Sequence, residues 1–164
     1  MSAATAHPTV PRQVGAGLVF VVAVVLAASL GGLTVANTAA DYVALRQPSW
    51  APPSWLFGPV WTVLYALMAL AGWLLWRDSR GPARGSALAA FGVQLLLNAL
   101  WTPLFFGARL YGLAFAELLL LWVAIGVTVW RFFPLHRTAA VLLLPYWAWV
   151  SFAGALNFAI WQLN

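Results

Sequence analysis

The sequence contains no cysteine and no lysine, and Asp41, Asp78 and Glu117 are its only carboxylates among 164 residues. The absence of cysteine excludes disulfides, thiolate nucleophiles and thiolate metal sites. The two histidines, His7 and His136, have no acidic residue or second histidine at metal-ligand spacing. We therefore interpret both as exposed loop histidines and expect neither a metal site nor a bound cofactor.

Catalytic signatures are absent as well. The chain has no Ser/His/Asp set, no close pair of carboxylates and no GxxxxGK phosphate loop, so conventional acid–base or nucleophilic catalysis is not expected. Eight arginines give a formal charge of +5. They are too scattered along the sequence to follow a phosphate backbone, so we do not expect nucleic-acid binding.

Apolar residues are what the chain has in excess: 64% of it is hydrophobic and 7% is charged, where soluble domains are about a quarter charged. Several apolar runs reach the roughly 20 residues that a helix needs to cross a bilayer. The sequence predicts an all-α integral membrane protein, a five-transmembrane-helix bundle forming a single domain over residues 1–164. The expected spans are residues 14–36, 57–76, 86–106, 110–132 and 138–163, with a loop at 37–56.

The first span has a competing interpretation as a signal peptide, because Arg12 precedes its apolar core. Its apolar run is longer than the usual signal core of about 7–15 residues, which favours a membrane helix.

The arginines predict an orientation, since cytoplasmic loops are enriched in basic residues. Five spans place two arginines, Arg46 and Arg109, on one side of the membrane. The other side receives the remaining six, namely Arg12, Arg77, Arg80, Arg84, Arg131 and Arg137. We therefore expect a cytoplasmic N-terminus, with the C-terminus and loop 37–56 on the opposite side.

Three spans each carry a stripe at helical spacing that mixes aromatic with polar side chains. The stripes are Trp61, Tyr65, Met68 and Gly72; then Gln94, Asn98, Trp101 and Phe105; then Tyr146, Trp149, Ala153, Leu156 and Asn157. Polar groups in hydrocarbon should face the bundle interior. One interpretation is hydrogen bonding between helices, worth about 0.6–2 kcal/mol per contact. The other is an aromatic-walled small-molecule cavity.

The connection between the first two spans reads "PSWAPPSWLFGPVW". Proline fixes φ and disfavours helix in the residue before it, so we expect a stiff, extended lid over the outward mouth of the bundle. Trp50 and Trp55 are candidates either for plugging this mouth or for anchoring at the membrane interface.

The blocks "PSWAPPSWLFGPVWTVLYALM", "LNALWTPLFFGAR" and "LPYWAWVSFAGALNFAIW" resemble the TspO/translocator protein family, also called tryptophan-rich sensory proteins. The resemblance runs from Tyr42 to Trp161 and implies a five-helix membrane bundle that is commonly dimeric. By position it implies a ligand pocket, a lid tyrosine and a fourth-helix acid. The pocket residues are Trp61, Asn98, Trp101, Trp149 and Ala153, the lid tyrosine is Tyr42, and the acid is Glu117.

The resemblance implies a membrane-embedded protein that binds tetrapyrroles such as protoporphyrin IX and acts in sensing or regulation. An alternative is light-dependent porphyrin degradation with Trp61 and Trp149 as redox groups. Another is transport of porphyrin or other small hydrophobic ligands, against which the lack of an inverted repeat argues. Phe158 and Gln162 replace the Tyr and basic residue of the animal cholesterol motif, which argues against sterol binding.

A homodimer through the third span is also expected. Gly85 with Ala89, and Ser86 with Ala90, form small-xxx-small pairs that let two helix backbones approach closely.

Overall fold

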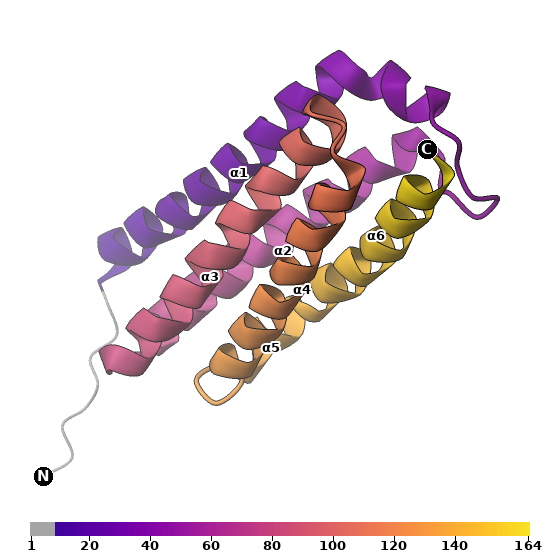
Figure 1. Cartoon of the computed structure of the whole chain (residues 1–164). Coiled ribbons are helices and arrows are strands. Elements are labelled where there is room, and N and C mark those ends of the chain that lie inside the picture. The colour runs from indigo at the N-terminus through magenta and orange to yellow at the C-terminus, as the bar shows by residue number, and fades with distance from the viewer. Residues whose placement is uncertain (1–8) are drawn as a thin grey trace, which may run out of the picture.

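The structure, a computed structural model, describes residues 9–164, except for the side chains of residues 34–41. His7 and the side chain of Asp41 lie outside this range. The described residues form helices without any strand: α1 (Val10–Ala44), η1 (Ser54–Leu56), α2 (Phe57–Asp78), α3 (Gly81–Thr102), η2 (Pro103–Gly107), α4 (Tyr111–Phe132), α5 (Arg137–Leu142) and α6 (Leu144–Leu163). Five segments are long and apolar enough to span a membrane, with α5 and α6 forming the fifth. The predicted five-helix membrane bundle is confirmed (Figure 1).

Helix α1 is longer than expected. It continues past residue 36 to Ala44, so the connection to η1 is shorter than the expected loop 37–56. Between Gly32 and Pro48 the sequence offers no glycine or proline to end a helix. The first strong breaker is Pro48, so the chain leaves the helix only shortly before it.

Two prolines shape the later spans. Pro103 begins η2, a π-helical turn at the end of α3, which widens the helix where it contributes to the cavity described below. Pro145 lies in the first turn of α6. Because proline has no N–H to continue the preceding helix, the fifth span is divided between α5 and α6 at Leu143.

Close packing of α1 and α3 around α2 depends on a small residue in α2. A Cβ atom added to Gly72 would lie 2.6 Å from the ring of Phe20 on α1 and 3.3 Å from that of Phe91 on α3. Phe20 and Phe91 meet edge to face, with ring centroids 6.0 Å apart. Gly72 therefore lets two aromatic rings fill the space between three helices.

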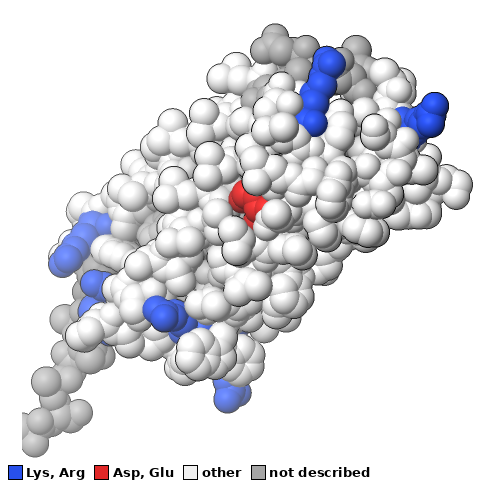
Figure 2. Space-filling view, viewed as in Figure 1, with Lys and Arg blue, Asp and Glu red and all other residues white. Residues whose placement is uncertain are grey.

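The arginines lie toward the two ends of the bundle, and a single acidic patch interrupts the otherwise uncharged surface between them in this view (Figure 2). The start of α1 and the C-terminus lie at opposite ends of the bundle (Figure 1). The end that includes the start of α1 is the arginine-rich end; it also contains the α2–α3 and α4–α5 connections. At this end Trp73 donates its indole N–H to the carbonyl of Gln13 at 3.0 Å and so ties α2 to α1.

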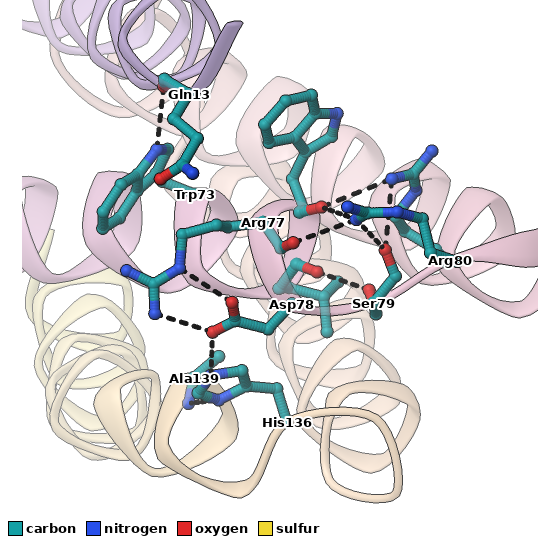
Figure 3. Close-up of polar contacts among 11 residues, drawn as sticks. Gln13, Trp73, Arg77, Asp78, Ser79, Arg80, His136 and Ala139 are labelled. Atoms are coloured by element: carbon teal, nitrogen blue, oxygen red, sulfur yellow. Dashed lines mark hydrogen bonds and ion pairs between the residues drawn. The ribbon is translucent and has the colours of Figure 1, made fainter. Parts of the chain in front are cut away.

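His136 differs from the expected exposed loop histidine. Its Nδ1 accepts the backbone N–H of Ala139 at 3.1 Å and caps α5, while Nε2 lies 3.1 Å from a carboxylate oxygen of Asp78 (Figure 3). Asp78 also accepts two hydrogen bonds of 2.8 Å from Arg77. Contacts between residues 58 positions apart depend on how the helices pack, so sequence spacing could not reveal them.

Candidate ligand cavity

A cavity of about 510 Å³ opens within the bundle at the end opposite the arginine-rich end. Its wall is formed by parts of α1, η1, α2, α3, η2, α4 and α6. Seven of the candidate residues line it: Tyr42, Trp61, Tyr65, Asn98, Trp101, Trp149 and Ala153. Six of them belong to the stripes at helical spacing, whereas Tyr42 was implied only by the family resemblance.

Aromatic rings make up much of the wall. The ring centroids of Trp61 and Tyr65 on α2 lie 5.3 Å apart, and Trp61 meets Tyr146 of α6 edge to face at 6.2 Å. On the α3 side, Trp101 stacks on Phe105 at 5.1 Å. Contacts between neighbouring rings hold these faces in place, so the cavity presents ordered flat surfaces.

Two buried amides tie these aromatic residues together across helices. The Tyr65 hydroxyl donates to Asn98 Oδ1 at 2.8 Å and joins α2 to α3. The Trp101 indole N–H donates to Asn157 Oδ1 at 3.1 Å, and the Asn157 amide in turn donates to the carbonyl of Tyr111 at 2.9 Å. The interpretation as interhelical hydrogen bonding therefore holds for both amides, although both also line the cavity.

One buried polar group of the cavity residues lacks a hydrogen-bond partner among the described residues. This group is the indole nitrogen of Trp149. An unsatisfied buried donor costs about 1–3 kcal/mol. A ligand acceptor placed against Trp149 would remove that cost.

Two polar residues expected to matter lie away from the cavity. Gln94 continues the stripe of α3 but is buried one turn deeper, and its amide has no partner among the described residues. Glu117 on α4 is the acid that the family resemblance implies. Its oxygens are also buried without a partner in the described part of the chain, and it does not line the cavity.

Near the mouth of the cavity, aromatic contacts link the end of α1 and the connection 45–53 to α2 and α6. Tyr42 meets Phe57 edge to face at 5.5 Å, and Phe57 meets Trp149 at 5.9 Å. Trp50 of the connection packs on Phe152 at 5.8 Å. Trp55 lines the cavity and Trp50 does not, so of the two candidate plugs only Trp55 reaches it.

Tyr42 also anchors the connection itself. Its hydroxyl donates to the carbonyl of Pro52 at 3.4 Å, and Gln47 donates its side-chain amide to the carbonyl of Tyr42. These two hydrogen bonds hold the connection against the end of α1.

The sequence interpretation missed the contribution of α1. Ala28, Gly31 and Gly32 line the cavity, and a Cβ atom on Gly31 would lie 3.1 Å from the Thr102 hydroxyl of α3. The only signal was the run of small residues "AASLGG" in an otherwise aliphatic span. Small residues let α1 approach closely without filling the cavity.

Charged groups are absent from the described lining of the cavity. Arg46 and Arg109 are exposed and belong to the same end of the bundle, but neither lines the cavity. Among the described residues there is also no group of three or more His, Asp or Glu side chains that could hold a metal ion.

Comparison with known proteins gives consistent matches. The sequence model of the TspO/MBR family matches residues 19–162. The tryptophan-rich sensory protein of Cereibacter sphaeroides is 42% identical over 123 residues, covering 75% of this chain and 76% of that protein. The translocator protein of Ovis aries is 40% identical over 125 residues, covering 75% and 74%. Protein CrtK of Rhodobacter capsulatus is 36% identical over 151 residues, covering 89% and 91%.

Proposed function

The chain belongs to the TspO/MBR family, and on that premise we propose that it is a membrane-embedded receptor for a tetrapyrrole of the protoporphyrin IX type. The ligand lies in the aromatic cavity, and its occupancy is the signal that the protein passes on in a sensory or regulatory role. Among the relatives, one is named a tryptophan-rich sensory protein and another a translocator protein.

The observation that carries this proposal is the chemistry of the cavity wall. Four indoles, those of Trp55, Trp61, Trp101 and Trp149, share a cavity whose described lining contains no charged residue. A large planar aromatic ligand gains stacking contacts with such a wall. The unpartnered indole N–H of Trp149 supplies a donor for an acceptor atom of the ligand.

The size of the cavity agrees with this ligand class. Its volume of about 510 Å³ lies within the range of about 300–1,000 Å³ that is usual for small-molecule sites. The anionic propionates of a porphyrin are best satisfied outside the apolar wall. Arg46 and Arg109 are the exposed cations at this end of the bundle, so we place the propionates toward the mouth.

A titration in the dark tests the proposal. Protoporphyrin IX is added to the purified protein in nanodiscs, and its absorbance is followed against empty nanodiscs. We expect saturable binding of one porphyrin per chain, and no competition from cholesterol. Binding that stays proportional to the lipid content, without a protein-dependent component, would contradict the proposal.

A second candidate function is light-dependent degradation of the bound porphyrin, because both redox-capable indoles, Trp61 and Trp149, line the cavity. Under illumination in air, this function requires a protein-dependent loss of porphyrin absorbance that Trp149→Phe abolishes. If the protein only binds the porphyrin, the porphyrin absorbance should fall at the same rate as in empty nanodiscs.

A further inference from the structure

A second, larger cavity of about 1,180 Å³ lies at the arginine-rich end, far from the site already described. It is formed by the start of α3, the end of α4, the α4–α5 connection, the start of α5 and Trp147 of α6. The residues lining it are Ala83, Ser86, Gly126, Val129, Trp130, Arg131, Phe133, Pro134, Leu135, His136, Arg137 and Trp147. None of these lining residues is a carboxylate.

Two guanidinium groups line this cavity, and neither forms an ion pair with a described carboxylate. Arg131 donates one nitrogen to the carbonyl of Ser86 at 3.3 Å, and Arg137 lies over the ring of Phe133 at 5.7 Å. Asp78 is engaged by Arg77 and His136 and does not line the cavity. The cavity thus concentrates positive charge at the membrane boundary.

The rest of the lining is apolar and aromatic. Val129, Phe133, Leu135 and Trp147 supply apolar parts of the wall, and Trp130, which also lines the cavity, is 73% exposed. The indole nitrogen of Trp147 is buried and has no partner among the described residues. A Cβ atom on Gly126 would lie 2.9 Å from the Trp147 ring, so Gly126 allows this ring to lie directly against α4.

We propose that this cavity binds an anionic phospholipid, with the phosphate held by Arg131 and Arg137 and the upper acyl chain lying against Trp147, Phe133 and Val129. Basic pockets between membrane helices recognise anionic headgroups in this way. Guanidinium groups form strong charge-assisted hydrogen bonds to phosphate oxygens.

The apolar walls favour a lipid over free phosphate. A phosphate ion would use the arginines and leave the walls of Val129, Phe133 and Trp147 uncovered. Because the cavity lies where α4 reaches the membrane boundary, with the exposed Trp130 in its lining, a lipid can enter sideways from the bilayer. The proposed lipid site requires only that these residues lie together in the bundle. It does not depend on which side of the membrane the arginine-rich end faces.

Native mass spectrometry of the full chain tests the proposal, with lipids counted per chain after phosphatidylglycerol or phosphatidylcholine is added in detergent. The test variant is Arg131→Gln with Arg137→Gln. The matched control is Arg12→Gln with Arg80→Gln, which removes the same charge from the same end but from residues outside the cavity. Ala83→Trp is a third variant, which narrows the cavity without changing its charge.

The wild-type chain should retain one phosphatidylglycerol in preference to phosphatidylcholine. One arginine near an anionic lipid contributes about fivefold in affinity, so the test variant should lose about tenfold or more of this preference. The control variant should keep it, and Ala83→Trp should lower it. Inorganic phosphate should not displace the bound lipid.

Three results would overturn the proposal. Equal retention of both lipids by the wild type would mean that no headgroup is selected. An equal loss of the phosphatidylglycerol preference in the test and control variants would show that only the overall positive charge at this end of the bundle matters. Full displacement by inorganic phosphate would identify an anion site without a lipid.

Discussion

Asn157 and Trp101 carry the tightest polar contact between α3 and α6. Asn157 is 1% exposed, and its oxygen accepts the Trp101 indole N–H at 3.1 Å. Trp122 on α4 donates a similar hydrogen bond to Ser151 at 2.8 Å, but this pair is exposed. The two indoles therefore offer a comparison between buried and exposed hydrogen bonds.

We expect Trp101→Phe to lower the free energy of unfolding by about 1–3 kcal/mol, because it leaves the buried oxygen of Asn157 without a donor. Trp122→Phe should cost about 0.5 kcal/mol or less, since the Ser151 hydroxyl keeps its hydrogen bond to the carbonyl of Trp147 at 2.9 Å. Denaturant unfolding in detergent, followed by circular dichroism, measures both. Equal losses of unfolding free energy in the two variants would show that burial does not determine the cost of removing these hydrogen bonds.

At the residue scale, helical spacing was enough to predict which faces of α2, α3 and α6 point into the bundle. It assigned Trp61, Asn98 and Trp149 each to an inward face of its own helix, because side chains three and four positions apart share a face. That the three faces meet at one cavity depends on how the helices pack. Spacing gives no depth along a helix, so Gln94 was grouped with the cavity although it lies below it. The Asp78–His136 contact was missed because it depends on tertiary packing.

Among the helices, the packing of α1 and α3 on α2 depends on the missing side chain at Gly72. A methyl group there would press on Phe20 and Phe91, at 2.6 and 3.3 Å. Gly92 on α3 has open space around it, so it provides a control with the same chemical change.

Gly72→Ala should lower the free energy of unfolding by about 1–3 kcal/mol, as overpacking does in a filled core. Gly92→Ala should raise it by up to about 0.5–1 kcal/mol, because alanine favours helix over glycine. Thermal unfolding followed by circular dichroism compares the two. A gain in stability for Gly72→Ala would mean that Phe20 moves aside freely.

The spans could be predicted at the element scale because hydrocarbon forces long apolar helices. Their ends could not be predicted equally well. Helix α1 runs on to Ala44 because no glycine or proline lies between Gly32 and Pro48, and Pro145 divides the last span because it lacks an N–H. The cause of each boundary is present in the sequence. The spans, however, were predicted from hydropathy, which does not register a single proline or the lack of a helix breaker.

The whole molecule has a strong asymmetry of charge between its ends, from which we infer an N-terminus in the cytoplasm. Because the chain has no cysteine, single cysteines report sidedness without background. Ala83→Cys at the start of α3 and Ser49→Cys in the connection before η1 are both exposed.

In intact cells, a membrane-impermeant thiol reagent should label the chain at Ser49→Cys and leave Ala83→Cys unlabelled until the membrane is opened. The opposite pattern would reverse the proposed orientation. Labelling of both from outside would contradict a fixed orientation.

A homodimer is a second proposal for the whole molecule. The surface of α3 at Gly85, Ser86 and Ala89 is exposed, so a second copy can approach it closely. Ala89→Leu with Ala90→Leu should shift the detergent-corrected mass in light scattering toward the monomer. Ala116→Leu, on the exposed face of α4, should leave the mass unchanged. A dimer that survives the double change would use another surface.

The proposed receptor function depends on where the porphyrin binds, and the affinities of two tryptophan variants locate it. Trp149 lines the proposed porphyrin cavity of about 510 Å³, whereas the exposed Trp130 lines the second cavity at the arginine-rich end. In a dark titration followed by porphyrin absorbance, Trp149→Ala should weaken protoporphyrin IX binding several-fold or more, because one stacking indole contributes about 0.5–1.5 kcal/mol beyond area burial. Trp130→Ala should leave the dissociation constant nearly unchanged. Equal weakening of porphyrin binding by both substitutions, or an effect of Trp130→Ala alone, would contradict binding in the cavity that Trp149 lines.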